Sequence, residues 1–265
     1  MTKTIYDFGM NIAEDTEYYL KRGFRVIAIE ANPSLCRNAA ERFASEVESG
    51  QLRIVNKAIG DKAGTFRFYI CAEMSAWSTA SEELRAYWQG RGATFSPIEV
   101  EFVGADEVIK ENGQPYFAKI DIEGNDIICL EHIKRSRKFP KYLSFEVDLR
   151  RYREALKLCH DMGYKKFALV DQKQVPLQRI PVDSLEGAKI EYEFKTGQSG
   201  LFGQDLKNSW AGYESINAAC LILSIQGKLG AVINKTASTV GRKANLDWIL
   251  PRTQTWYDVH AGVEV

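Results

Sequence analysis

Residues 4–30 read TIYDFGMNIAEDTEYYLKRGFRVIAIE, and this stretch decides the fold. A short apolar run over residues 4–8 breaks at Gly9, where glycine lets the backbone turn tightly. Residues 11–22 then favour a helix, and residues 24–30 are rich in apolar and β-branched side chains. A strand, a helix and a second strand in this order predict the first unit of a parallel α/β sheet.

The same alternation continues to about Asp171. We expect helices over residues 33–48, 126–136 and 152–162, and strands over residues 52–59, 65–70, 116–122, 142–147 and 166–170. Strands that alternate with helices of this length are typical of α/β domains. The predicted fold class is therefore α/β, with a mostly parallel central sheet and helices on both faces.

The alternation stops after Asp171. Residues 172–212 are rich in Gly, Gln, Ser and Lys, and we expect long loops or a lid there. Residues 217–223 and 229–233 have short helical patterns. We divide the chain into a core over residues 1–171 and a loop-rich C-terminal extension over residues 172–265. The extension is expected to belong to the same domain and to form its acceptor side.

Composition excludes several classes of protein. Lys and Arg total 35 and Asp and Glu total 35, so the net charge of +0 argues against a nucleic-acid partner. The longest apolar run, residues 218–223, is too short to span a membrane. The N-terminus, MTKTIYDFGM, lacks the apolar core of a signal peptide. Five scattered cysteines favour free thiols in the cytoplasm, and the oligomeric state is not indicated.

The loop after the first strand indicates which cofactor fits. Gly9 allows close approach of a ligand, and Glu30 ends the second strand, where a carboxylate can accept from both ribose hydroxyls. A dinucleotide would place its pyrophosphate at the helix N-terminus, where Glu14 and Asp15 would repel it. S-adenosylmethionine has no phosphate and carries two cationic groups. It is therefore the favoured cofactor, and a nicotinamide-dependent sugar oxidoreductase is the alternative.

Acidic residues also follow two later strands. Asp121 and Glu123 come after one buried strand, and Glu146 ends the next. Because carboxyl ends of parallel strands share one edge of a sheet, these groups are candidate catalytic bases, and His260 is a fourth. Asp121 and Glu146 also offer the oxygen ligands that suit Mg²⁺. No pair of histidines has the spacing of a zinc site.

Five motifs in order resemble the FkbM family of S-adenosylmethionine-dependent methyltransferases. They are DFGMN (7–11), VIAIEANP (26–33), AIGDKAGTFRFYI (58–70), KIDIEGND (119–126) and LSFEV (143–147). The resemblance implies a class I, Rossmann-like methyltransferase fold and methyl transfer to a hydroxyl of a sugar, glycan or related natural product. The family's first motif has glycine where this chain has Ala13, and Met10 also departs from it.

The resemblance also implies roles for particular residues. Asp7, Gly9 and Asn11 would surround the methionine part of the cofactor, and Glu30 would bind its ribose. Ala58 and Ile59 would flank the adenine, and Asp121 would lie near the transferred methyl group. The adjoining residues complete the candidate cofactor set: Met10, Asp15, Thr16 and Asn32.

The acceptor is expected to meet aromatic side chains, because flat rings suit the faces of sugars. Trp77 and Ser78 lie in a loop between strands, and Phe202 and Trp210 lie in the extension. The resulting hypothesis is an O-methyltransferase that acts on a small molecule or glycan. A catalytically inactive, cofactor-binding subunit remains a second alternative, which would bind S-adenosylmethionine without transferring its methyl group.

Overall fold

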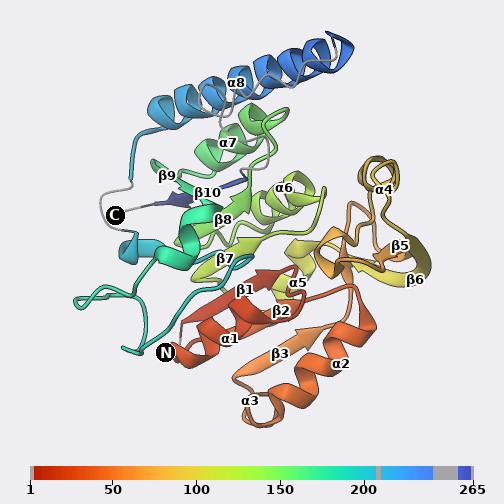
Figure 1. Ribbon diagram of the computed structural model, residues 1–265. Helices are drawn as coiled ribbons and strands as arrows, with labels where there is room; N and C mark the ends of the chain where they lie inside the picture. Colours follow the sequence, from red (N-terminus) through yellow and green to blue (C-terminus); the bar gives the residue numbers. More distant parts are fainter. Residues whose placement is uncertain (1–2, 207–209, 241–255, 264–265) are drawn as a thin grey trace.

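The computed structural model describes residues 3–206, 210–240 and 256–263, and only the backbone of residues 228–240. Within these residues, seven strands form a central sheet in the order β3-β2-β1-β7-β8-β10-β9 (Figure 1). In that order they are Leu52–Val55, Arg25–Ile29, Thr4–Phe8, Phe117–Ile120, Tyr142–Glu146, Tyr257–Gly262 and Lys166–Asp171. The neighbouring strands β3, β2, β1, β7 and β8 pair in parallel, which confirms the predicted α/β class.

The last strand lies inside the sheet. β10 pairs antiparallel with β8 on one side and with β9 on the other. The extension, expected to hold loops and two short helices, thus also contributes a strand over residues 257–262. The strand is short and is not preceded by the alternation of strands and helices seen in the core, so the only local signal is its period of two. Its two neighbours supply the hydrogen bonds that make it a strand.

Helices cover both faces of the sheet, as predicted (Figure 1). Successive side chains of a strand point to opposite faces. One face packs against α1 (Glu14–Lys21), α2 (Pro33–Arg42) and parts of residues 172–206. The other face packs against α5 (Ala105–Asn112), α6 (Asp126–Ser136), α7 (Tyr152–Asp161) and the start of α8 (Tyr213–Val240).

A buried ion pair ties the extension to the core. The Arg22 side chain is fully buried, and its guanidinium lies 3.2 Å from the Asp205 carboxylate. The same guanidinium donates to the hydroxyls of Ser184 at 2.6 Å and Tyr18 at 3.1 Å. A buried charge requires such partners. Ser184 and Asp205 of the extension are therefore fixed against the end of α1.

Residues 58–103 form a smaller sheet beside the central one. It has the order β4-β6-β5, from β4 (Ala58–Ile59), β5 (Gly64–Cys71) and β6 (Phe95–Val103), and carries η1 (Ser75–Trp77) and α4 (Glu82–Gln89). The predicted strand over residues 52–59 is thus two strands in different sheets. The Thr79 hydroxyl donates to the Glu123 carbonyl at 2.6 Å, which fastens this smaller sheet to the loop after β7.

Two helices differ from the prediction. The helix expected over residues 33–48 breaks at Phe43, whose φ of −115° and ψ of 37° are not helical and whose ring is buried in the core. Residues 44–48 continue as α3 (Ala44–Glu48). The two short helices expected over 217–223 and 229–233 are one helix, α8. No helix within the described ranges is long and apolar enough to span a membrane.

Candidate active site

A cleft lies at the carboxyl ends of β1, β2 and β7, where the strand order reverses. Open α/β sheets bind ligands at this point. The core contributes Gly9, Asn11, Ile29, Glu30, Ala31, Lys57, Asp121, Ile122, Glu123 and Asn125 to its lining, and the smaller sheet contributes Ala58, Ile59, Phe68, Ser75, Ala76, Ser78 and Ala80. Six of the candidate cofactor residues therefore share this cleft: Gly9, Asn11, Glu30, Ala58, Ile59 and Asp121.

The loop after β1 has room only for glycine at its turn. A Cβ atom on Gly9 would lie 1.8 Å from the Asp121 carbonyl oxygen, and its φ is +90°. Asn11 and Ala13 follow with φ of 50° and 63°, in the left-handed region. Ala13 thus adopts a conformation that glycine favours, so its departure from the family motif leaves the loop conformation available.

Glu30 faces the cleft from the end of β2. One carboxylate oxygen accepts from the Asn11 N–H at 2.9 Å, and the other accepts from the Asn32 N–H at 2.7 Å. Burial raises the pKa of Glu30, and these two backbone hydrogen bonds oppose the shift. Each carboxylate oxygen has a second lone pair, so both can still accept from ribose hydroxyls.

A buried lysine lies beneath the floor of the cleft. The Lys119 ammonium donates to the Gly9 carbonyl at 2.8 Å and lies 3.3 Å from the Asp7 carboxylate and 3.6 Å from that of Asp121. Burial alone would lower the pKa of Lys119. The neighbouring carboxylates of Asp7, Asp121 and Asp15 outweigh burial and raise it. Lys119 is therefore charged and joins the loop after β1 to the loop after β7.

Three predicted cofactor residues support this floor and do not line the cleft. The Thr16 hydroxyl donates to Asp7 at 2.6 Å, and the Asp15 carboxylate accepts from the Ser199 N–H at 3.0 Å. Burial raises the pKa of Asp15 to about 7, against the lowering effect of Lys119 and with a further rise from Asp7. These contacts hold the loop after β1 in place from the side that faces away from the cleft.

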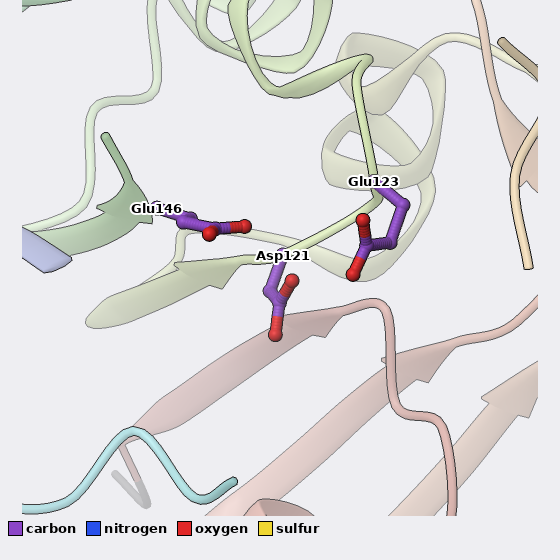
Figure 2. Close-up of side chains that lie close together, drawn as sticks. All are labelled: Asp121, Glu123 and Glu146. Carbon is purple, nitrogen blue, oxygen red and sulfur yellow. The ribbon is translucent and has the colours of Figure 1, made fainter. Parts of the chain in front are cut away.

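Three carboxylates lie close together (Figure 2), and two of them, Asp121 and Glu123, line the cleft. Asp121 and Glu123 lie in the loop after β7, and Glu146 lies at the end of β8. One oxygen of each lies within 4.8 Å of the others. We call Asp121, Glu123 and Glu146 the acid cluster. Sequence reasoning grouped these residues correctly because their strands are parallel neighbours.

Burial and nearby negative charge disfavour ionisation of Glu123 and Glu146. Burial, followed by the charge of Asp121, raises the pKa of Glu146 to about 8 and that of Glu123 well above its usual value. The same causes raise the pKa of Asp126, at the start of α6, to about 6. A group in such a site can accept a proton near neutral pH, or a bound cation can stabilise its charge.

Asp258 is a neighbour of the acid cluster that the sequence analysis did not single out. It lies on β10 in register with Glu146, is 8% exposed, and feels the charges of Asp121 and Glu146. The available signal was the period of two in residues 257–262, which places Asp258 and His260 on one face. The prediction chose His260 instead.

His260 lies two residues further along β10 than Asp258, opposite Ser144 of β8. It is 2% exposed, and neither ring nitrogen has a hydrogen-bond partner among the described residues. Burial lowers its pKa to about 3. This interior position argues against His260 as the base, because no acceptor reaches its ring nitrogens.

Several other predicted residues lie in the core or at its edge. Phe202 is buried and stacks on Phe117 at 4.3 Å, and Trp210 packs against Tyr142. Met10 is also buried, and the Asn32 side chain accepts from the Ser34 N–H at the start of α2. Phe202, Trp210 and Met10 therefore serve packing in this structure, which corrects the expected contacts with ligands.

Two predicted acceptor residues stay near the cleft. Ser78 lines it, and Trp77 precedes Ser78 in the chain. The Trp77 ring stacks on Trp88 of α4, with centroids 4.2 Å apart and planes 6° from parallel. The smaller sheet thus carries an aromatic pair whose Trp77 lies between the cleft residues Ala76 and Ser78 in the chain but does not itself line the cleft.

The arrangement suits an adenosine-containing cation. Glu30 offers ribose acceptors, and the buried Asn11 Oδ1 has no hydrogen-bond partner among the described residues. An ammonium could donate to Asn11. This pattern of acceptors therefore fits S-adenosylmethionine.

Comparison with known proteins agrees with this pattern. The methyltransferase FkbM domain matches residues 7–172. Among solved structures, a precorrin-6y C5,15-methyltransferase from Geobacter metallireducens is similar, with a TM-score of 0.38, 14% identity and coverage of 64% of this chain and 68% of that one. An rRNA methylase from Streptococcus thermophilus has a TM-score of 0.34 and 11% identity over 70% of this chain and 81% of that one.

No curated protein matches the sequence. The FkbM match spans most of the chain. It includes the cleft, the loop after β1 and the acid cluster. It identifies an S-adenosylmethionine-dependent methyltransferase with a class I, Rossmann-like fold and replaces the nicotinamide-dependent alternative. The chain belongs to the FkbM family of methyltransferases.

Proposed function

We propose that this methyltransferase transfers the methyl group of S-adenosylmethionine to a hydroxyl of a sugar or glycan. The observation that carries the proposal is the acid cluster, of which Asp121 and Glu123 line the cofactor cleft. Carboxylates there can take the proton of a hydroxyl that attacks the methyl carbon.

The cofactor end of the proposed site rests on four residues. S-adenosylmethionine supplies a methyl group on a sulfonium, which is already a good leaving group. Glu30 would accept from the ribose hydroxyls, and Asn11 would accept from the ammonium. Gly9 and Asp121 would bound the methionine part. Their main task is alignment, which supplies about 7–11 kcal/mol in well-oriented reactions.

The acceptor end rests on the acid cluster. A hydroxyl oxygen forms its bond to the methyl carbon while the carbon–sulfur bond breaks, and the hydroxyl proton passes to a carboxylate. A positioned base adds about 10²–10⁴-fold to the rate. Glu146, whose pKa is raised to about 8, is the first candidate for that base, and Glu123 is the second.

A sugar is the favoured acceptor for two physical reasons. The acid cluster places carboxyl groups where the phosphates of an RNA would need cations. The Trp77–Trp88 pair, which adjoins the cleft residues Ala76 and Ser78 in the chain, offers apolar faces suited to a sugar ring. A neutral, donor-rich acceptor fits both features.

The test has a binding arm and a transfer arm. Calorimetry should show binding of S-adenosylmethionine and S-adenosylhomocysteine. Labelled S-adenosylmethionine should then transfer its methyl group to one or more of a panel of methyl glycosides and bacterial polysaccharides, and not to ribosomal RNA. Labelling of RNA alone would contradict the proposed acceptor class.

The variant Asp121→Asn should bind the cofactor within a few-fold of wild type and lose most transfer. Asp61→Asn, which changes an exposed carboxylate outside the cleft, is the matched control and should retain full transfer. Cofactor binding without transfer to any acceptor would favour an inactive subunit.

A further inference from the structure

The C-terminal strand brings a fourth carboxyl group to the acid cluster. Asp258 of β10 is in register with Glu146 of β8, in an antiparallel pair. Directly opposed side chains in such a pair share a face, with Cβ atoms about 4.5–5.5 Å apart. Asp258 therefore lies beside Glu146 on the face that carries Asp121.

The Asp258 carboxyl has no compensating partner within the described ranges. It is 8% exposed, and it makes no hydrogen bond or ion pair with a described residue. The nearest cation, Lys119, is engaged by the Gly9 carbonyl and by Asp7. A buried carboxylate without a donor or cation is costly. Asp258 thus points to a missing positive charge at this place.

The acid cluster has the geometry to supply the remaining ligands. Its three carboxylate oxygens lie within 4.8 Å of one another. Oxygens bound to one divalent ion at about 2.0–2.6 Å lie at most about 4–5 Å apart. The ligands are all oxygens, which favours a hard ion such as Mg²⁺ over zinc or copper.

We propose that Asp121, Glu123 and Glu146 bind one hard divalent cation of the Mg²⁺ type, and that Asp258 supplies charge to this site from the C-terminal strand. The binding of the ion stands on this geometry alone. Its role rests on the proposed function.

In that role, the ion holds the acceptor oxygen. With the ion bound, Glu146 serves as its ligand and no longer as the base. The ion lowers the pKa of the hydroxyl, whose proton leaves to water, and the resulting alkoxide forms its bond to the methyl carbon as the carbon–sulfur bond breaks. An adjacent ring hydroxyl can occupy a second position on the ion. The acid cluster then acts through the cation and orients a diol for methylation of one hydroxyl.

The test uses Mn²⁺ as the probe, because its electron paramagnetic resonance signal reports bound ion directly. The full chain at pH 7.5 should bind one Mn²⁺ with an affinity between micromolar and millimolar, and Mg²⁺ should displace it. Glu146→Gln and Asp258→Asn should each weaken binding by about 10–100-fold. Tyr257→Phe, one residue away on the opposite face, should bind Mn²⁺ like wild type.

Circular dichroism and S-adenosylmethionine affinity should be unchanged in these variants, which shows that they fold. Absence of Mn²⁺ binding at 5 mM, about the upper limit for a functional site of this kind, would overturn the proposal. Equal binding by wild type, Glu146→Gln and Asp258→Asn would also overturn it. Binding of the cofactor without binding of Mn²⁺ would contradict the metal site and leave the proposed function standing. Binding of Mn²⁺ without binding of the cofactor would contradict the proposed function and leave the metal site standing.

Discussion

Asp258 lies in register with Glu146 in the antiparallel pair of β10 and β8, so residues far apart in the chain place two carboxyl groups side by side. The position depends on the insertion of β10 between β8 and β9. His260, two residues further along the same strand, lies opposite Ser144 and is enclosed by the core. A shift of two residues therefore separates a carboxyl group next to Glu146 from a buried imidazole.

The buried imidazole of His260 makes a prediction about acid stability. Its folded pKa of about 3 lies below the ordinary 6.5, because burial disfavours the charged ring. Below pH 6.5 the unfolded chain binds more protons than the folded one, so the folded state loses up to about 1.4 kcal/mol per pH unit from this group.

We expect His260→Leu to remove this loss, because leucine fills the space without titrating. Urea unfolding of both proteins at pH 7, 6, 5 and 4.5 measures it. The stability of the variant relative to wild type should rise steadily as the pH falls, and methyl transfer at pH 7 should be kept. A constant difference between the two proteins would contradict a buried neutral histidine.

Glu30→Ala should weaken S-adenosylmethionine binding by about 10–150-fold, because a hydrogen bond to a charged group contributes about 1.5–3 kcal/mol. Calorimetry measures the change. The 2′-deoxy analogue of S-adenosylhomocysteine separates a ribose contact from a general disturbance of the loop. Wild type should bind the analogue less tightly than S-adenosylhomocysteine, and Glu30→Ala should bind the two alike. Equal discrimination in both proteins would mean that Glu30 only holds the Asn11 and Asn32 amides.

Gly9→Ala should abolish cofactor binding and lower stability by several kcal/mol, about the upper end for point variants. Its Cβ would lie 1.8 Å from the Asp121 carbonyl oxygen, so either the loop after β1 or the loop after β7 must move. Gly50→Ala is the matched control. Gly50 has a similar φ of +74°, but nothing lies within 4 Å of its added Cβ, so only about 1–2 kcal/mol of backbone strain is expected. Equal effects of the two changes would contradict the close approach at Gly9.

Arg22→Met should destabilise the protein by about 3–5 kcal/mol, because it leaves the Asp205 carboxylate buried without its cation. The double variant Arg22→Met/Asp205→Leu should recover most of that loss, since no unpaired charge remains. Thermal and urea unfolding measure both effects. If the double variant is as unstable as the single one, the contribution comes from the hydrogen bonds of Arg22 to Ser184 and Tyr18.

The parallel core, and the strand ends at which the proposed cofactor residues stand, follow from local sequence alone. Periodicity over residues 4–30 marks strand, helix and strand, and Gly9 and Glu30 stand at the ends of the two strands. Asp121 and Glu146 follow strands in the same way. Parallel strands align their carboxyl ends, so position in the sequence is sufficient to place these residues at one edge.

Tertiary structure decided what the chain beyond residue 171 does. The local sequence of residues 257–262 does not show that they lie between β8 and β9, because both partners are distant in the chain and supply the hydrogen bonds. That insertion decides that Asp258 meets Glu146 and that His260 is buried. Likewise, the aromatic character of Phe202 suggested a ligand contact, but stacking on Phe117 made it part of the core. Local patterns fix elements and strand ends, whereas long-range pairing decides which distant side chains meet.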